Sequence, residues 1–268
     1  MLVIFSGGSG VGKNTVIAEL IKTGGFALLP TYTTRKKRPT ESEGNPYCFV
    51  DEETFKKKIE EKELYEYENV HGHYYGTSKK LLKERLALGK ILLKDIDVLG
   101  TQNLVKSIGK DVKIVTLFLK VDSKEVLVKR LTERKETEIE KRLARYDMEM
   151  TYCDKYDYII NNEELYDTVK TVLAIVKAES ENAEINTAEA VIPSAEEISD
   201  LVNRLNNGET LPPVKVALHN GEFVVAEGGA RYLAGLKSGK RVAKEIVKTA
   251  VIPVGGEKWR AAIENAKR

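Results

Sequence analysis

The sequence predicts an α/β fold with a mostly parallel sheet, followed by a small α+β domain at the carboxyl-terminal end. Short apolar runs alternate with amphipathic stretches through the first 180 residues, which is typical of a parallel sheet covered by helices on both faces. The first apolar run leads into a glycine-rich loop and then into a helical pattern. The composition changes near residue 180, since eleven of the twelve tyrosines precede that point. We therefore predict two domains, at residues 1–180 and 181–268.

The first strand is expected at residues 1–5, where a continuous apolar run ends in Ser-Gly-Gly. The first helix is expected at residues 13–22, because Val16, Ile17 and Leu20 recur with helical spacing. The same two patterns predict strands at 26–29, 91–93, 112–119 and 158–160, and helices at 51–62, 78–88, 123–133, 136–153 and 165–178.

The second predicted domain begins after an Ala-rich, weakly patterned stretch at 180–190, which we interpret as a linker. Ser194 is a suitable cap for a helix at 195–206 that has acidic residues in its first turn. Two β-type runs, at 214–218 and 223–226, flank Asn220-Gly221 and predict a hairpin. A turn and a helix are expected at 228–238, and Trp259 is expected to pack a last helix onto this domain.

The composition limits the class of protein. The chain has 268 residues, of which 42% are hydrophobic, so it can form a sizeable core. Its net charge of +2 argues against broad nucleic-acid binding and leaves a local basic site open. Cys48 and Cys153 are expected to be unpaired thiols. With no apolar run near the ~20 residues of a membrane span and no visible signal peptide, we expect a cytoplasmic protein, either a monomer or a homo-oligomer.

The glycine-rich loop has the G-x-x-x-x-G-K spacing of a phosphate-binding loop and lies between a predicted strand and a predicted helix. Glycines let successive backbone N–H groups face a phosphate, and the helix N-terminus adds the positive end of its dipole. The lysine supplies a full charge for the β- and γ-phosphates. The residues expected to bind the phosphates of a nucleoside triphosphate here, which the resemblance described below implies to be ATP, are Gly8, Ser9, Gly10, Val11, Gly12, Lys13, Asn14 and Thr15.

The residue after Lys13 departs from this pattern. A Ser or Thr usually stands there and places its hydroxyl on Mg²⁺, whereas this chain has Asn14. An amide oxygen is also a hard ligand, so we expect Mg²⁺ as the cofactor of ATP and Asn14 as one of its ligands. Thr15, one residue further on, points about 100° away around the helix.

Several segments in one order resemble the guanylate kinase family over nearly the whole of residues 1–180. They read GGSGVGKNT, TYTTRKKRP, GNPYCFV, ELYEYENVHGHYYGTS, LLKDIDVLG, KRLTERKETEIEKRLAR and YDYIINNEEL. The resemblance implies a P-loop nucleoside monophosphate kinase fold. It also implies the family's reaction, in which ATP and GMP or dGMP give ADP and GDP or dGDP.

Arg35 and Arg38 are spaced so that both can clamp a dianionic phosphate from one loop. On the same resemblance, Tyr47 and Tyr75 add hydroxyl donors to the GMP phosphate. Because two lysines lie between the arginines, a solvated basic loop is the alternative interpretation.

Guanine donates from N1–H and its 2-amino group and accepts at O6 and N7. A selective pocket therefore needs carboxylates on one edge and hydroxyls on the other, and adenine would leave those carboxylates unpaired. Asp95 follows a predicted strand and is expected on the metal side. The residues that match the family's base-reading positions are Glu66, Asp97, Thr31 and Thr77, the family usually having Ser in place of Thr31.

Phosphoryl transfer requires positioning and the neutralisation of charge on the phosphoryl oxygens. The segment that resembles the family's lid is rich in arginine, and an exposed charged helix is the alternative interpretation. In this segment Lys135 stands where the family usually has Gly. Asn162 matches the family's adenine-side asparagine and joins the ATP-binding residues. The catalytic residues expected are Lys13, Arg130, Arg134 and Arg142, with Arg145 as a further candidate.

The block LPPVKVALHNGEFVVAEGGARYLAGLKSG resembles the ParB/sulfiredoxin-like fold. That family usually has one acidic and two basic residues at the turn, where they bind nucleotide phosphates, and here only Arg231 remains. We therefore expect an accessory or oligomerisation module.

Two further functions stand beside an active GMP kinase. One is a non-catalytic guanylate-kinase-like binding module, against which Lys13, Arg35 and Glu66 argue because all are present. The other is a nucleotide- or DNA-binding regulator acting through the ParB-like domain. The zero net charge of residues 181–268 is unfavourable for it, which leaves nucleic acid as a partner only through that domain.

Overall fold

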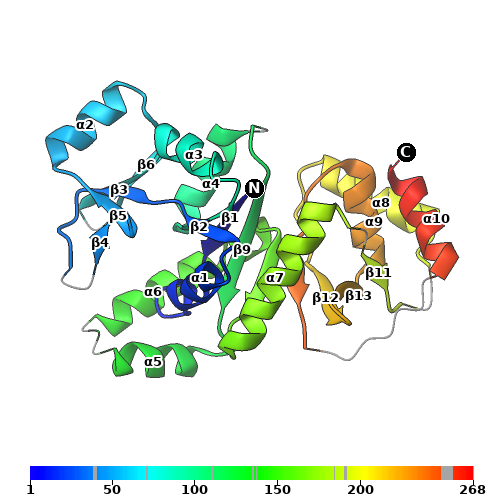
Figure 1. The fold of residues 1–268 in the computed structure, drawn as a ribbon. Coiled ribbons are helices and arrows are strands. Elements are labelled where there is room, and N and C mark those ends of the chain that lie inside the picture. Colours follow the sequence, from blue (N-terminus) through cyan, green and yellow to red (C-terminus); the bar gives the residue numbers. More distant parts are fainter. Residues whose placement is uncertain are drawn as a thin grey trace. The chain divides into compact units, whose positions relative to one another are not determined.

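The computed structural model describes residues 1–38, 41–70, 72–109, 111–134, 136, 138–183, 185–189, 192–248 and 256–267 (Figure 1). They form two compact units. Unit 1 comprises Met1–Gly7 and Gly12–Thr116, and unit 2 comprises Gly8–Val11 and Leu117–Arg268. These units divide the chain at positions other than residue 180. The domain boundary at residue 180 stays a prediction.

Unit 1 contains a parallel three-strand layer in the order β1 (Leu2–Ser6), β8 (Ile91–Asp95), β2 (Phe26–Leu28). All of β1 is buried, as its continuous apolar sequence predicted. The core of this layer joins residues of the strands to residues of α3 (Lys79–Leu86) and α4 (Val98–Ile108). The helix predicted after the glycine-rich loop is α1 (Lys13–Lys22).

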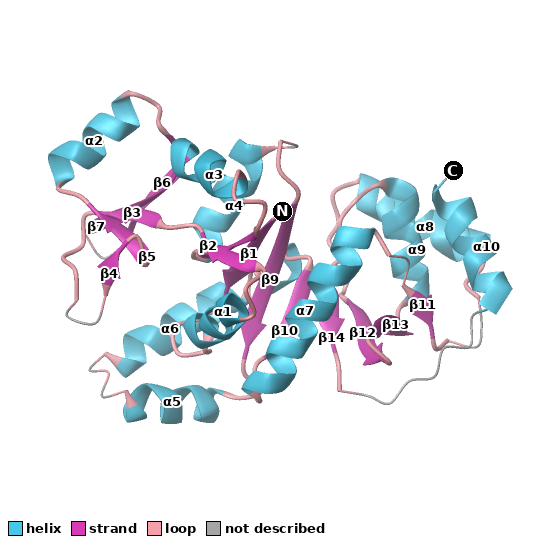
Figure 2. Ribbon diagram, viewed as in Figure 1, coloured by secondary structure: helices cyan, strands magenta, loops and turns pink. Residues whose placement is uncertain are grey.

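A second sheet in unit 1 was not predicted. Its strand order is β4-β5-β3-β7-β6, with β3 antiparallel to β7 and parallel to β5 (Figure 2). β6 and β7 contain few aliphatic residues and many polar and aromatic ones, so no continuous apolar run marked them. The predicted helix α2 (Glu52–Glu60) is present, and the Asp51 carboxylate accepts the Thr54 amide at its start. The strands are β3 (Thr31–Thr33), β4 (Ser42–Glu43), β5 (Pro46–Phe49), β6 (Leu64–Val70) and β7 (His73–Ser78).

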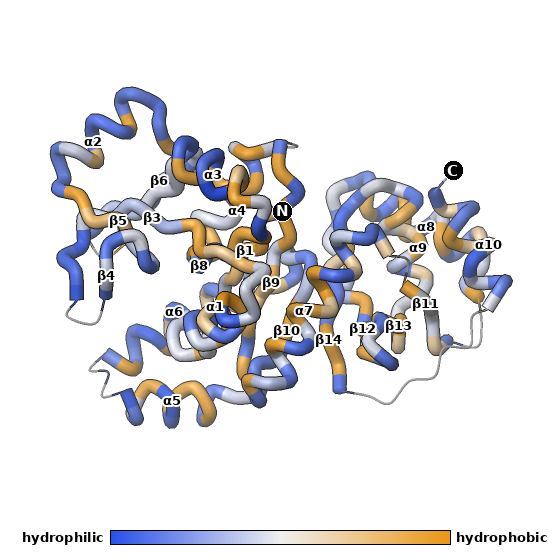
Figure 3. Tube along the Cα trace, in the orientation of Figure 1, coloured by the Kyte–Doolittle hydropathy of each residue, from blue (hydrophilic) through white to orange (hydrophobic). Residues whose placement is uncertain are grey.

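The chain passes from unit 1 into unit 2 within β9 (Ile114–Lys120). This strand pairs in parallel with β10 (Tyr158–Asn161). Figure 3 shows both strands as predominantly apolar. The predicted helix at 136–153 is shorter, at α6 (Ile139–Met150), and a 3₁₀ turn, η1 (Cys153–Lys155), follows it. Asn182, in a left-handed conformation, ends the last helix of this part. The other helices here are α5 (Lys124–Glu133) and α7 (Leu165–Glu181).

The carboxyl-terminal part of unit 2 contains the predicted hairpin of β12 (Val214–His219) and β13 (Glu222–Glu227). Asn220 and Gly221 both have positive φ, at 51° and 85°, as a tight hairpin turn requires. The Ser194 cap of the predicted helix is also present. The segment predicted as a linker instead contributes β11 (Asn186–Thr187) to the sheet, because it pairs with β13. The helices of this part are α8 (Ala195–Asn206), α9 (Gly229–Ser238) and α10 (Gly256–Lys267).

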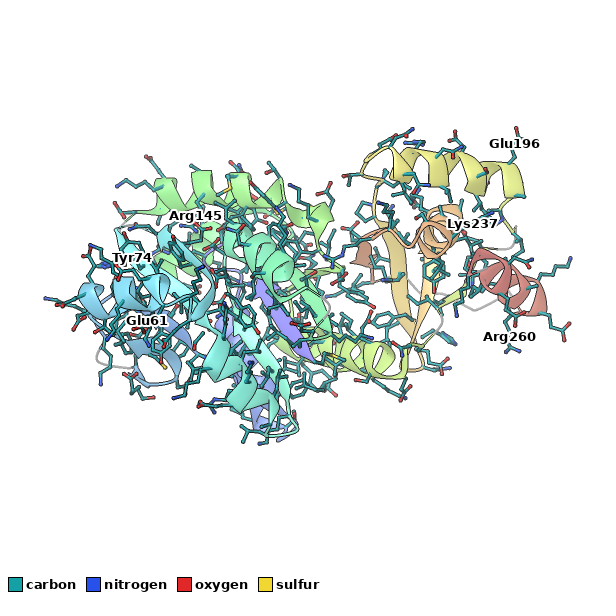
Figure 4. The ribbon with its side chains drawn as sticks, turned by 90° about the horizontal axis from the view of Figure 1, so that it is seen from above. Glu61, Tyr74, Arg145, Glu196, Lys237 and Arg260 are labelled. Atoms are coloured by element: carbon teal, nitrogen blue, oxygen red, sulfur yellow. The ribbon has the colours of Figure 1, made fainter. Side chains whose placement is uncertain are left out.

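Trp259 joins α10 to this part, as expected. Its indole is buried, stacks on Tyr232 and donates a 2.9 Å hydrogen bond to the Ile185 carbonyl. Figure 4 labels Glu196, Lys237 and Arg260 on α8, α9 and α10, and all three are exposed charged side chains. The three helices thus have charged outer surfaces around an apolar interior.

The carboxyl-terminal strands continue the sheet that β9 and β10 begin. β14 (Lys244–Ile246) pairs in parallel with β10 on one side and with β12 on the other, giving the order β11-β13-β12-β14-β10-β9. Ion pairs reinforce the junction, with Lys120 2.7 Å from Glu245 and Arg241 2.9 Å from Asp157. In unit 2, therefore, β10 is an interior strand of the sheet.

We expect a chain that ends at Asn182 to have a lower melting temperature and to self-associate. Without β14, β10 becomes an edge strand with unpaired backbone groups beside buried Tyr158 and Ile159, and such edges pair with other chains. Thermal unfolding and size-exclusion chromatography with light scattering measure both effects. An unchanged melting temperature together with a monomeric elution would contradict this prediction.

Candidate nucleotide site

The glycine-rich loop places Lys13 at the first position of α1. The Lys13 ammonium donates a 2.5 Å hydrogen bond to the Gly7 carbonyl and lies 3.8 Å from the Asp95 carboxylate. Asn14 and Thr15, in the first turn, are exposed. The Lys13 side chain is thus held by the Gly7 carbonyl of the loop and by Asp95, the last residue of β8.

In unit 2 the loop packs closely against two helices. A Cβ atom at Gly8 would come within 2.3 Å of the Tyr146 ring of α6. Gly10 has φ +93°, and a Cβ there would meet Leu127 of α5 at 2.8 Å. Gly10 therefore requires glycine for its backbone conformation, and a side chain at Gly8 would have to displace the Tyr146 ring.

Two of the predicted arginines contact this loop. The Arg130 guanidinium donates to the Val11 carbonyl at 3.2 Å and to the Asn162 carbonyl at 3.0 Å. Arg142 donates to the Ser9 hydroxyl and forms a 2.6 Å ion pair with Glu136. The structure therefore brings both arginines to the phosphate-binding loop.

The other predicted arginines are placed differently. Arg134 caps the end of α5 with its side chain exposed, and Arg145 pairs with Glu149 at 2.9 Å. Lys135, where the family usually has Gly, lies outside the described residues.

Asn162 is buried beside the loop. Its side-chain NH₂ donates a 2.6 Å hydrogen bond to the Val11 carbonyl. Within the part of the chain that the structure describes, its Oδ1 is buried without a hydrogen-bond partner. A buried acceptor of this kind is costly unless a ligand pairs with it, so the amide is suited to an amino group such as that of adenine.

A second cluster lies in unit 1, on β3, β5, β7 and the loop after β3. The Arg35 guanidinium lies 5.1 Å from the centroid of the Tyr47 ring, and the Tyr47 and Tyr75 rings are 5.9 Å apart. Burial, with a further contribution from Asp95, raises the pKa of Tyr47 to about 12, so its hydroxyl stays protonated and can donate. Three of the four predicted phosphate-binding residues are thus together.

Glu41 completes this cluster and was missed in the sequence. It forms a 2.6 Å ion pair with Arg35 and accepts the Arg38 amide at 2.8 Å. Burial opposes ionisation, but the hydrogen bonds from Arg35 and Arg38 lower the pKa of Glu41 overall. The Arg38 side chain is exposed, and Arg38 reaches the cluster through its backbone N–H and through the effect of its charge on Glu41. The available signal was an acidic residue three positions after Arg38 in the same loop.

The predicted base-reading residues also meet in unit 1. Glu66 of β6 lies opposite Thr77 of β7, and the Thr77 hydroxyl donates to the Glu66 carboxylate. Burial raises the pKa of Glu66, and the positive charge of Lys94 opposes that rise. Thr31 of β3 joins them through Lys94, whose ammonium donates to the Thr31 hydroxyl at 2.7 Å.

Lys94 was not singled out in the sequence, although a lysine inside an apolar strand was a visible signal. Its side chain is fully buried. Burial lowers its pKa to about 8, and the carboxylates of Glu66 and Asp95 act in the opposite direction.

Asp97 has a structural role that the sequence analysis did not predict. Its Oδ1 accepts the backbone N–H groups of Leu99 and Gly100, at 2.9 and 3.0 Å, and so caps α4. The Asp97 charge also acts on Glu66, so the two carboxylates lie in the same region of unit 1.

The donor chemistry of the loop is compatible with Mg²⁺. Mg²⁺ is held by one or two protein oxygens together with substrate phosphates rather than by a cage of side chains. Among the described residues, no group of three or more His, Cys, Asp or Glu side chains could hold a metal by itself. Asn14, the second residue of α1, and Asp95, the last residue of β8, offer hard oxygen atoms for such a site.

A phosphate-binding loop at the end of a parallel strand, with a separate buried carboxylate–hydroxyl cluster, defines a P-loop phosphotransferase of the nucleoside monophosphate kinase class. The family model for guanylate kinase matches residues 1–179. The chain belongs to the guanylate kinase family.

Known relatives match the same part of the chain. The guanylate kinase of Thermotoga maritima is 38% identical over 180 residues, covering 66% of this chain and 86% of that protein. The guanylate kinase of Helicobacter pylori strain 26695 is 41% identical over 183 residues, with the same coverage. The crystal structure of guanylate kinase from Anaplasma phagocytophilum superposes with a TM-score of 0.54 and 30% identity, over 67% of this chain and 85% of that one.

Proposed function

We propose that this chain transfers the γ-phosphoryl group of ATP to GMP, giving ADP and GDP. Membership of the guanylate kinase family supports the reaction. The observation that carries the substrate assignment is the buried Glu66 carboxylate, held by Thr77 and set beside Lys94 and Thr31. Guanine presents two adjacent donors, N1–H and the 2-amino group, to a buried carboxylate, and adenine lacks both of them.

The acceptor phosphate is assigned to Arg35, Tyr47 and Tyr75. The guanidinium provides charge and planar donors, and the hydroxyl groups of the two tyrosines can donate hydrogen bonds. In the structure Glu41 neutralises Arg35, and a bound phosphate would share that guanidinium with Glu41. Arg38, exposed on the same loop, supplies a second cation.

The donor phosphates are assigned to the backbone N–H groups of Gly8–Val11 and Gly12 and to the Lys13 ammonium. Arg130 and Arg142, which contact Val11 and Ser9, add positive charge next to the loop. We also propose Arg134 as a catalytic residue and Asp97 as a base-reading carboxylate. The buried Asn162 Oδ1 is assigned to the adenine amino group.

Asn14 and Asp95 would hold Mg²⁺ with ATP, directly or through water. When bound, the metal neutralises charge on the phosphate oxygens. The residues of the chain position the two nucleotides, hold the developing charge and exclude water from the transferred group.

The carboxyl-terminal part is proposed to be an accessory module. The Glu189 carboxylate accepts the N–H groups of Gly228 and Gly229, at 2.8 and 2.9 Å, and so occupies the start of α9. Arg231 donates to the Pro213 carbonyl. These internal contacts use the groups that a ParB-like domain would offer to a nucleotide phosphate, which favours an accessory role. Among the described residues no helix is long and apolar enough to cross a membrane.

A coupled assay of ADP formation tests the proposal with ATP, Mg²⁺ and one nucleoside monophosphate at a time. We expect turnover with GMP and with dGMP, and much slower turnover with AMP, CMP and UMP. If the purified full-length chain forms no ADP with GMP or dGMP, the proposed function is wrong.

Arg35→Ala is expected to raise the KM for GMP by about 30-fold, since a charge-assisted hydrogen bond to phosphate contributes roughly 2 kcal/mol. Arg38→Ala is expected to act in the same direction with a smaller effect, because its side chain is exposed. The KM for ATP stays unchanged in both variants. Steady-state kinetics with each substrate varied in turn provides the test, and an equal rise in the KM for ATP would contradict the site division.

A further inference from the structure

Lys94 is a fully buried cation in the middle of the unit 1 core. It is the fourth residue of β8, pairs with Ile4 of β1, and is preceded by Leu92 and Leu93, which are also fully buried. A lysine at such a position costs free energy unless its charge and its donors are matched. The Thr31 hydroxyl accepts from it at 2.7 Å, and the carboxylates of Glu66 and Asp95 favour its charged form.

The bond between Lys94 and Thr31 has only one possible direction. An ammonium has three donors and no acceptor, so the Thr31 oxygen must accept. A hydroxyl has a single hydrogen, and that hydrogen is therefore left for another acceptor. Thr31 is 8% exposed, so it can present this hydrogen to a ligand, whereas Lys94 is 0% exposed and cannot reach one.

The Thr77 hydroxyl has the opposite hydrogen-bonding role to that of Thr31. Its hydroxyl hydrogen is used in the bond to the Glu66 carboxylate, so Thr77 can only accept from a ligand. Of the two predicted base-reading hydroxyls, only Thr31 is therefore set to donate to O6 or N7 of a purine.

Lys94 also balances the charge of Glu66. The Glu66 side chain is 8% exposed, and the other charge acting on it from the base-reading set, Asp97, is of the same sign. An ionised carboxylate is a pure acceptor and can accept from both guanine N1–H and the 2-amino group, whereas a protonated carboxyl group loses part of that capacity. The Lys94 cation favours the ionised form.

We propose that Lys94 is a positioning residue for guanine recognition, which fixes Thr31 as a donor toward O6 or N7 and keeps Glu66 as an acceptor for the opposite edge of the base. This inference rests on the proposed function. Lys94 acts through Thr31 and Glu66 and does not touch the nucleotide.

Lys94→Met tests the inference, because it keeps the length and apolar stem of the side chain and removes the charge and the donors. We expect the KM for GMP to rise about tenfold, the size of one lost hydrogen bond to a charged group, while kcat and the KM for ATP stay unchanged. IMP, which shares O6 and N7 with GMP, should lose affinity by the same factor. The ratio of kcat/KM for GMP over AMP should fall.

Leu93→Met is the matched control, since it alters packing in the same strand without changing charge. Thr31→Val removes the hydroxyl and should also raise the KM for GMP, with Lys94 intact. The double variant Lys94→Met/Thr31→Val should lose less affinity for GMP than the sum of the two single variants, because part of the effect of Lys94 passes through Thr31. Calorimetric titration of GMP gives its affinity independently of turnover.

The outcomes separate the two proposals. An unchanged KM for GMP in a folded Lys94→Met variant, or strictly additive losses in the double variant, would overturn the role of Lys94 and leave the kinase reaction standing. A fall in kcat together with similar rises in the KM for GMP and the KM for ATP would show a general structural role for Lys94. That result would also overturn the inference. If Lys94→Met does not fold, an unchanged KM in Thr31→Val overturns the inference by itself. A wild-type chain that neither binds nor phosphorylates GMP overturns the proposed function, and this inference with it.

Discussion

Lys13→Met is expected to lower kcat by roughly 10²- to 10³-fold, the effect of removing one preorganised donor from developing charge. Lys13 is the full charge of the phosphate-binding loop, and it is held in place by the Gly7 carbonyl and by Asp95. The negative charge on the phosphoryl oxygens must be neutralised as the group is transferred, and methionine cannot do this. The KM for GMP should change little, because the acceptor cluster of Arg35, Tyr47 and Tyr75 does not include Lys13.

Lys22→Met is the matched control for this variant. Lys22 is the last residue of the same helix, is exposed and forms an ion pair with Glu19. Its loss should therefore leave kcat unchanged. Initial rates at saturating ATP and GMP measure both variants, and thermal unfolding checks that both are folded. A Lys13→Met variant that keeps kcat close to the wild-type value would exclude the proposed role of the loop in phosphoryl transfer.

Glu66→Gln is expected to lower the ratio of kcat/KM for GMP over AMP by at least about 10²-fold. A site that selects one base by hydrogen bonds loses selectivity on this scale when a buried hydrogen-bonding group no longer matches the base. The substituted amide can still accept from Thr77, so the strand pair β6–β7 is kept. Its NH₂ group would oppose the N1–H and 2-amino donors of guanine, but it can pair with N1 of adenine. Activity with GMP therefore falls, while activity with AMP is unchanged or rises.

Glu68→Gln serves as the control for Glu66→Gln. Glu68 lies two residues further along β6, and its carboxylate accepts a 2.6 Å hydrogen bond from Asn103. It is not part of the base-reading cluster, so the preference for GMP should be retained. Competition between GMP and AMP in one assay mixture compares the two variants directly. A Glu66→Gln variant with unchanged selectivity would reject the assignment of Glu66 to the base.

The phosphate-binding loop and the helix after it could be predicted because their signals are local. Glycines at fixed offsets from Lys13 and apolar residues at helical spacing in α1 need no distant partner to be recognised. The hairpin at Asn220-Gly221 was predictable for the same reason, since its turn demands positive φ at two consecutive residues. The Ser194 and Asp51 caps are likewise set within one helical turn.

The small sheet that carries the acceptor site was missed because its strands carry no local pattern of their own. β6 pairs with β7, which also pairs with β3, and the Tyr and Glu residues of β6 range from buried Glu66 to exposed Tyr67. The continuation of the sheet through β14 was missed as well, because a three-residue strand becomes visible only through its pairing with β10 and β12. Glu41 and Lys94 escaped notice for a related reason, since each acquires its role from a residue on another strand or further along a loop.

The sequence by itself determined the class of reaction, because a phosphate-binding loop is a contiguous piece of chain whose chemistry depends on residue types at fixed spacing. It also named Arg35, Tyr47, Tyr75, Glu66, Thr31 and Thr77 as candidates. Only the tertiary structure decided how these groups are paired. It placed Glu66 against Thr77, a buried lysine behind Thr31, and the Asp97 oxygen on the amides of α4. The direction of a hydrogen bond and the ionisation of a buried group depend on neighbours that folding brings together from distant parts of the chain.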